Sequence, residues 1–111
     1  MTPRSSLGEL EQMVLLAILR LGDDAYGPET ARVLEERAGR ALSRGALYAT
    51  LDRLERKGML TWAVEDEGSG PGGHRRRRFA LTEVGIVEMS EARLVWTRLF
   101  EGLDSKLEPV R

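Results

Sequence analysis

Cysteine is absent from this 111-residue sequence, and histidine occurs only once. Disulfide bonds and thiol chemistry are therefore excluded, and the composition fits a reducing cytoplasm. The acidic residues Asp23 and Asp24, and those at 65–67, have no basic or nucleophilic partner suitably placed beside them. Because catalysis and metal binding need several such groups together, we predict no enzyme activity, no metal site and no cofactor.

Long apolar runs are also missing. No stretch approaches the length that a membrane span needs, and residues 1–12 (MTPRSSLGELEQ) lack the apolar centre of a secretory signal. The length suits one domain with a modest core. We therefore expect a cytoplasmic protein without a membrane partner.

A strong net charge is missing as well, because 17 cations and 18 carboxylates give a formal charge of −1. Most nucleic-acid-binding domains are basic, so the total argues against such a partner. The distribution argues for one. Residues 40–57 contain five cations and two carboxylates, and residues 75–78 are four consecutive arginines. Since binding to a polyanion depends on local charge, both segments are candidate contacts.

Residues 43–58 (SRGALYATLDRLERKG) form the most informative segment. Ser43 suits a helix N-cap, and Gly58 suits the residue after a helix end. Leu47, Leu51 and Leu54 recur at helical spacing and predict one buried stripe. The opposite face would expose Gly45, Ala49, Asp52, Arg53 and Arg56, with Ala46 and Tyr48 at its borders. Such a helix can enter the major groove of DNA, although an ordinary solvated helix has the same pattern.

The first helix is predicted over residues 7–21, between a capping box formed by Ser6 and Glu9 and a stop at Gly22. Its residues are apolar nearly all round, so the helix must be buried on more than one side. Either a second subunit or two neighbouring elements of the same subunit could cover the additional side.

A second helix is predicted from Pro28, which suits a first helical turn, to a stop near Gly39. Only residues 40–42 separate this helix from Ser43. Two helices joined by so short a connection, the second of which exposes cations, indicate a helix-turn-helix.

Residues 60–65 change to a period of two, with Leu60, Trp62 and Val64 predicted inward. The glycine-rich residues 67–73 indicate a hairpin tip, and residues 75–81 indicate a return strand with Phe79 and Leu81 inward. A hairpin directly after a helix-turn-helix predicts a winged helix. The four arginines could contact DNA phosphates, or they could be a solvated charged stretch.

A last helix is predicted from a Thr82 cap through residues 83–103 or beyond. Its apolar side widens to two faces around residues 95–100, and no later part of the sequence could cover them. We therefore expect a twofold homodimer. The predicted interface residues are Leu10, Met13, Val14, Val95, Trp96, Leu99, Phe100 and Leu103.

Three blocks carry a family resemblance: LGELEQMVLLAIL, DDAYGPETARVLEERAGRALSRGALYATLDRLERKGML and GGHRRRRFALTEVG. The most specific part is GALY at 45–48, followed by Leu51, RLE at 53–55 and KG at 57–58. Over about residues 7–85, the chain resembles the PadR family of bacterial winged-helix transcriptional regulators.

The resemblance agrees with a mainly α fold with a small β-hairpin, divided into a winged helix-turn-helix DNA-binding domain (residues 1–81) and a C-terminal dimerisation helix (residues 82–111). It implies a repressor that binds an inverted-repeat site in double-stranded DNA as a homodimer, with the last helix of one subunit against the first helix of the other. Some family members sense flat aromatic compounds between their terminal helices. Trp96 could stack on such an effector, or could only fill the interface.

Arg44 is the first candidate for contact with a guanine edge, and Ser43 with the nearby backbone amides is a candidate for a phosphate. Tyr48 could bind a phosphate through its hydroxyl, or only pack at the border of the core. Arg77 or Arg78 could instead brace the hairpin against a carboxylate. The predicted DNA-binding residues are Ser43, Arg44, Gly45, Ala46, Tyr48, Ala49, Arg53, Lys57, His74, Arg75, Arg76 and Arg77. A winged helix that meets an acidic protein is the alternative.

Overall fold

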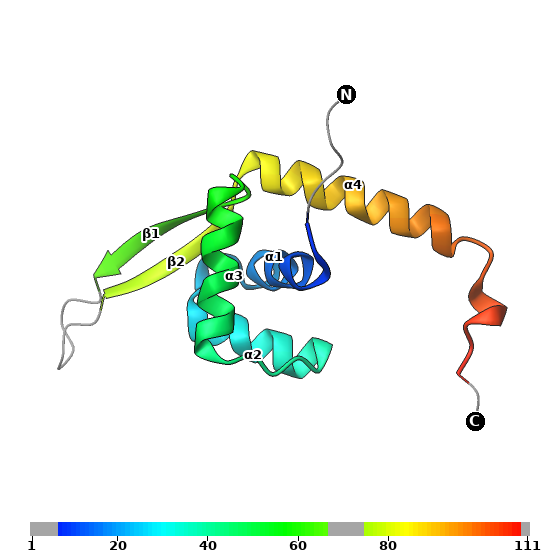
Figure 1. The fold of residues 1–111 in the computed structure, drawn as a ribbon, viewed down its shortest axis with the longest axis horizontal. Helices are drawn as coiled ribbons and strands as arrows, with labels where there is room; N and C mark the ends of the chain where they lie inside the picture. The colour runs from blue at the N-terminus through cyan, green and yellow to red at the C-terminus, as the bar shows by residue number, and fades with distance from the viewer. Residues whose placement is uncertain (1–6, 67–74, 110–111) are drawn as a thin grey trace.

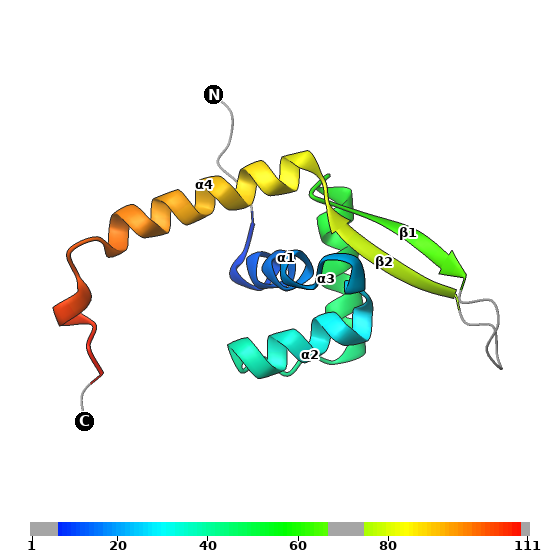
Figure 2. The ribbon, with the colours of Figure 1, turned by 180° about the vertical axis from the view of Figure 1, so that it is seen from behind.

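Three helices surround a small core, from which a two-stranded hairpin and a long fourth helix extend in opposite directions (Figure 1; Figure 2 shows the reverse side). The computed structural model describes residues 7–66 and 75–109. The helices are α1 (Glu9–Leu21), α2 (Gly27–Ala38), α3 (Arg44–Arg56) and α4 (Glu83–Phe100). Strands β1 (Leu60–Asp66) and β2 (Arg75–Leu81) form the antiparallel hairpin, and short 3₁₀ turns, η1 (Gly22–Asp24) and η2 (Asp104–Lys106), follow α1 and α4. The predicted mainly α fold with a small hairpin is confirmed.

Polar caps begin the third and fourth helices where the sequence predicts them. The Ser43 hydroxyl accepts a hydrogen bond from the Ala46 amide at 3.0 Å, and the Thr82 hydroxyl accepts one from the Gly85 amide at 3.1 Å. Each cap satisfies a backbone donor that has no partner within its helix. These two caps fix the entry into α3 and into α4.

The start of α1 differs from the prediction. The helix begins at Glu9 with Gly8 as its N-cap, and the Glu11 carboxylate accepts a hydrogen bond from the Gly8 amide at 2.8 Å. The predicted partner of Ser6, Glu9, instead bonds Arg40 at 3.3 Å. The capping box is therefore shifted, and Ser6 itself lies outside the described residues. The shift places a carboxylate at the third helical position, facing the core.

Helix α1 forms the centre of the core. It packs against α2, α3, β2 and α4, so elements of the same chain cover most of its apolar surface. Val14 is completely buried, and the prediction that it contacts a second subunit is therefore wrong. Leu16 and Leu19 of the same helix are about half exposed, at 52% and 44%. The buried apolar residues of the chain are Val14, Leu15, Ala17, Ile18, Ala25, Leu34, Leu47, Leu51, Leu54, Met59, Leu60, Phe79 and Met89.

The leucine stripe of α3 is buried as predicted, with Leu47, Leu51 and Leu54 each at most 2% exposed. Two threonine hydroxyl groups are buried in the same core, and each donates a hydrogen bond. Thr30 donates to the Tyr26 carbonyl at 2.8 Å, and Thr50 donates to the Ala46 carbonyl at 2.9 Å. These bonds offset the cost of burying the hydroxyls. The inner side of α3 is therefore fixed, and only its outer side is available to a partner.

The hairpin pairs Leu60 with Leu81, Trp62 with Phe79 and Val64 with Arg77. Its base is inserted in the core, where Phe79 is 2% exposed and donates its amide to the Ala25 carbonyl at 2.8 Å. The inward prediction fails at Val64, which is 47% exposed because this part of the strand extends beyond the helices. The outer half of the hairpin is thus a projecting wing.

Helix α4 is anchored only at its first turns, through the buried Gly85 and Met89. A side chain at Gly85 would collide with the carbonyl oxygen of Met59, so only glycine permits this close approach. The helix then leaves the core and ends at Phe100, earlier than the predicted Leu103. In residues 7–66 and 75–109, no helix combines the length and apolar character that a membrane crossing requires.

Candidate nucleic-acid interface

The outer face of α3 is exposed and consists of short side chains at its beginning. Ser43, Arg44, Gly45, Ala46 and Ala49 are all exposed. A Cβ atom added at Gly45 would meet nothing within 4 Å. The backbone of this first turn and a half can therefore approach a flat surface or a groove closely.

The cations at the end of α3 are held by a carboxylate from α1. Lys57 contacts both oxygens of Glu11, at 2.8 and 2.9 Å, and the Arg53 Nε lies 3.5 Å from one of them. The Glu11 side chain is only 6% exposed. The Lys57 ammonium is therefore held by a carboxylate of α1, and its contact with a DNA phosphate stays a prediction. Arg53, whose side chain is 45% exposed, keeps part of its guanidinium available.

Glu11 stays ionised in this setting. Burial alone raises the pKa of its carboxyl, but hydrogen bonds from Lys57 and the Gly8 amide, together with the charges of Lys57 and Arg53, lower the pKa by more than burial raises it. The net pKa lies below the ordinary value for glutamate. One carboxylate thus pairs with two cations and joins the start of α1 to the end of α3.

The four arginines at 75–78 are divided by the alternation of the strand. Arg76 points to the side of α2, where its Nη2 lies 3.0 Å from both oxygens of Glu29 and its guanidinium carbon lies 3.8 Å from the centre of the Tyr26 ring. Burial raises the pKa of Glu29, but the Arg76 hydrogen bond and charge outweigh it and the net pKa is lowered. Arg76 is therefore paired with a carboxylate of α2, and its contact with DNA stays a prediction.

Arg78 braces the same side of the hairpin, as one predicted alternative has it. Its Nε lies 3.0 Å from Glu65, and its Nη1 lies 3.7 Å from Asp23. The Tyr26 hydroxyl donates to Glu65 at 2.8 Å, and this bond is the main reason that the pKa of Tyr26 is raised. Arg76 and Arg78 together fix the direction of the wing.

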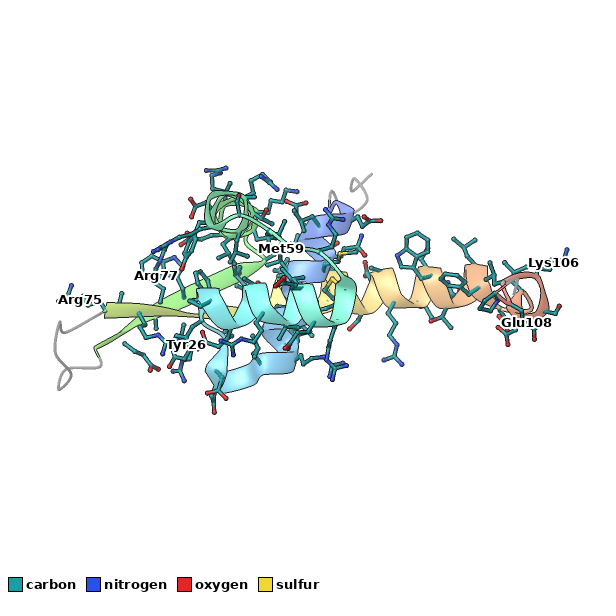
Figure 3. The ribbon with its side chains drawn as sticks, turned by 90° about the horizontal axis from the view of Figure 1, so that it is seen from below. Tyr26, Met59, Arg75, Arg77, Lys106 and Glu108 are labelled. Atoms are coloured by element: carbon teal, nitrogen blue, oxygen red, sulfur yellow. The ribbon has the colours of Figure 1, made fainter. Side chains whose placement is uncertain are left out.

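Arg75 and Arg77 lie on the other face of the strand. Figure 3 shows Arg75 near the outer end of the hairpin and Arg77 closer to the helices. The Arg77 guanidinium carbon lies 5.0 Å from the centre of the Trp62 ring, 5.6 Å from Phe79 and 5.3 Å from Tyr48. His74 is outside the described residues. Two of the four arginines are thus directed to the side where α3 exposes its first turn.

A cavity of about 680 Å³ lies where these elements meet. It separates the starts of α2 and α3 from β2 of the wing. The lining residues are Tyr26, Gly27, Pro28, Arg44, Tyr48, Arg75, Arg76 and Arg77. A hollow with four arginines in its wall favours an anionic ligand.

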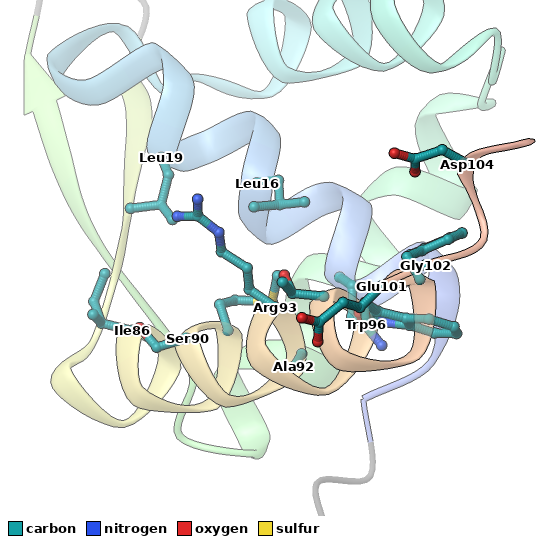
Figure 4. A pocket seen from close by; sticks show the side chains of 14 residues that line it. Leu16, Leu19, Ile86, Ser90, Ala92, Arg93, Trp96, Glu101, Gly102 and Asp104 are labelled. Carbon is teal, nitrogen blue, oxygen red and sulfur yellow. The ribbon is translucent and has the colours of Figure 1, made fainter.

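A second groove, of about 900 Å³, runs between α1 and α4 (Figure 4). Leu16 and Leu19 form one wall, and Ile86, Trp96 and Phe100 lie along the other. Of the residues predicted at a subunit interface, Val95, Trp96, Leu99, Phe100 and Leu103 are exposed. Leu10 and Met13 pack partly buried against the core.

Comparison with known proteins assigns the family. Residues 15–91 match the transcriptional regulator PadR-like family. The chain belongs to the PadR family. It is therefore a DNA-binding transcriptional regulator and not an enzyme. No curated protein matches it significantly.

Solved structures of PadR proteins share its fold. A PadR family regulator from Clostridium difficile R20291 is 27% identical with a TM-score of 0.71, and the match covers 87% of this chain and 97% of that chain. A PadR family regulator from Eggerthella lenta is 26% identical with a TM-score of 0.64, covering 92% and 88%. A PadR-like regulator from Bacillus cereus, 21% identical and covering 91% and 93%, has a TM-score of 0.70 and supports the fold alone.

Several residues of this PadR protein escape prediction from sequence. Glu11 carries no local signal, because its partner Lys57 is 46 residues away. The division of the arginines between two faces does have a local signal in the sequence. With Phe79 inward, a period of two places Arg77 on the same face of the strand as Phe79 and Arg76 on the opposite face. Within the described residues, no group of three or more acidic, histidine or cysteine side chains is arranged to hold a metal ion.

Replacing Glu11 by glutamine tests the link between α1 and α3. Because the substitution leaves Lys57 and Arg53 without their carboxylate, we expect the free energy of unfolding at pH 7 to fall by about 1–3 kcal/mol. The depressed pKa of Glu11 contributes stability that is present above its unfolded value and is lost as pH falls through the folded value. The deficit of Glu11→Gln should therefore shrink below about pH 4.5.

Denaturant unfolding of both proteins between pH 3 and 8 measures this difference. Glu9→Gln is the matched control, since Glu9 pairs with Arg40 on the surface and its side chain is 78% exposed. Its loss should be below about 1 kcal/mol. Equal losses for both variants, or a Glu11→Gln deficit that grows toward acid pH, would contradict the assignment.

Proposed function

We propose that this PadR regulator is a homodimeric repressor that binds an inverted-repeat operator in the cytoplasm, at the nucleoid. Residues 1–81 form its DNA-binding unit and residues 82–111 its dimerisation segment. The observation that carries the proposal is the exposed first turn of α3 beside Arg75 and Arg77 of the wing, which form no ion pair with residues 7–66 or 75–109. Helix and wing together suit a major groove and the adjoining backbone.

The composition of α3 supports limited direct reading of bases. Gly45, Ala46 and Ala49 are exposed and short, so the helix backbone can lie close to base edges. The alanine methyls can contact thymine methyls, but they offer no hydrogen bonds. Sequence preference therefore has to come largely from the spacing of two half-sites and from the wing.

The apolar groove between α1 and α4 supports a homodimer. Beyond its anchored turns, α4 exposes apolar side chains on several sides, including Leu94, Val95 and Leu99, which Phe100 and Trp96 extend. At 1.5 Å per residue, its 18 residues form a helix about 27 Å long. A second copy of α4, related by a twofold axis, can occupy the groove between α1 and α4 and cover both sets of residues. The same symmetry explains why the operator would be an inverted repeat.

A small aromatic effector is a second proposal for the same groove. Trp96 is 52% exposed, lines the groove, and its ring centre lies 6.2 Å from that of Phe100. An indole ring in this position can stack on a planar compound. Binding there would act on the dimer contact and thereby on DNA affinity.

For DNA binding, we expect the purified protein to retard a duplex from the region upstream of its own gene more strongly than a scrambled duplex. Arg75→Ala should lower the slope of log K against log salt by about 1 per subunit, because one phosphate contact is lost. Arg37→Ala, at the far end of α2, removes the same charge and should leave the slope unchanged. Binding only to an acidic protein, without any duplex binding, would refute the proposal.

For the dimer, we expect Leu99→Arg to sediment as a monomer at concentrations where the unchanged protein is a dimer. A buried arginine without a partner carboxylate opposes apolar packing. Val64→Arg introduces an arginine at an exposed apolar position of the wing, and this variant should remain dimeric. A dimeric Leu99→Arg protein would exclude this surface as the contact.

For the effector, Trp62→Phe leaves Trp96 as the single tryptophan, because the sequence contains two. We expect a planar aromatic compound to change its fluorescence in a saturable way, and to leave the fluorescence of Trp96→Phe unchanged. The absence of any saturable change over a chemically diverse set of planar compounds would count against an effector at Trp96.

A further inference from the structure

Two guanidinium groups converge on one tyrosine ring. The guanidinium carbon of Arg44 lies 5.7 Å from the centre of the Tyr48 ring, and that of Arg77 lies 5.3 Å from it. Both distances are within the range of a cation–π contact. The two arginines come from different elements, α3 and β2, and both line the cavity at the start of α2.

Neither arginine is neutralised. Among residues 7–66 and 75–109, Arg44 and Arg77 form no ion pair, whereas Arg40, Arg53, Arg76 and Arg78 each meet a carboxylate. Two like charges at one half-buried ring repel each other, and the repulsion is stronger than in bulk water. An anion between them would remove this cost.

The position of Tyr48 is set by packing. A Cβ atom at Gly27 would collide with the Tyr48 hydroxyl, so glycine at the start of α2 admits the tyrosine to the cavity wall. Arg77 is positioned in turn by Trp62 and Phe79, which lie on the same face of the hairpin. The two cations and the hydroxyl are thus arranged before any ligand arrives, which lowers the cost of binding.

We propose that this cavity is the seat of a single phosphate group of the DNA backbone, held by Arg44, Arg77 and the Tyr48 hydroxyl. The proposal rests on the proposed function and alters one part of it. Arg44 is assigned to a phosphate and no longer to a guanine edge. One phosphate would thereby join α3 to the wing, and its place along the strand would fix the register of each subunit on DNA.

The test uses duplexes in which one backbone phosphate at a time is replaced by a neutral methylphosphonate. For the unchanged protein, we expect one position in each half-site where the replacement weakens binding by about tenfold. Arg44→Gln and Arg77→Gln, which keep most of each side chain, should each weaken binding to the normal duplex and should both become insensitive to replacement at that same position. Tyr48→Phe should lose part of the sensitivity there.

Arg37→Gln is the control and should retain the sensitivity at that position. Unchanged thermal unfolding midpoints exclude a folding defect in the variants. The proposal is overturned if Arg44→Gln and Arg77→Gln lose sensitivity at different positions, if both keep it everywhere, or if Arg44→Gln changes the preferred base.

Inorganic phosphate provides an arm that does not require DNA. In NMR spectra of the full chain, we expect it to shift the side-chain Nε–H signals of Arg44 and Arg77, and not those of Arg76 or Arg78. If no duplex binds but these two signals shift, the cavity binds phosphate as proposed and the DNA-binding proposal fails. If no duplex binds and neither signal shifts, both proposals fail. If the duplex binds, the methylphosphonate result decides.

Discussion

A nearly buried carboxylate joins the central helix α1 to α3, the helix proposed to face DNA. Glu11 accepts hydrogen bonds from the Gly8 amide and from the Lys57 ammonium, and it forms an ion pair with Arg53. The same carboxylate therefore caps the start of α1 and holds the end of α3. Removing it would leave Lys57 and Arg53 without this carboxylate beside the core. Since the leucine stripe fixes only which face of α3 is buried, the ionic contact at one end limits how the helix can rotate or slide. The orientation of the exposed turn at the other end depends on both.

The wing is positioned by the same kind of contact. On one face of the hairpin, Arg76 pairs with Glu29, and Arg78 pairs with Glu65 and Asp23. Tyr26 connects the two arginines, because its ring lies under Arg76 and its hydroxyl donates to Glu65. The opposite face carries Arg75 and Arg77 toward α3. A run of four identical residues therefore meets two different surroundings, because a strand directs alternate side chains to opposite sides. Half of the run pairs with carboxylates of the same chain, and the proposal assigns the other half to an anion.

The sequence predicts those features that depend on neighbouring residues. The Ser43 and Thr82 caps, the stripe of Leu47, Leu51 and Leu54, and the end of α1 at Gly22 are local patterns and are confirmed. Contacts between distant residues were not accessible in this way: the burial of Val14, the Glu11–Lys57 pair and the Arg76–Glu29 pair depend on how the elements pack. Charge alone therefore does not define a DNA surface, because an arginine or lysine in the sequence does not reveal whether a carboxylate will pair with it.

This internal pairing further reduces the cations that a chain of net charge −1 can offer to DNA. Within the described part of the surface around α3 and the wing, Arg44, Arg56, Arg75 and Arg77 have no carboxylate partner. Few phosphate contacts per subunit give weak binding, since each contributes only about one unit to the salt slope. In the proposed homodimer, two linked subunits would make the second contact effectively intramolecular and gain affinity without new residues. The apolar surface of α4 and the sparse cations of α3 and the wing would then belong to one mechanism, in which dimerisation supplies the affinity that charge does not.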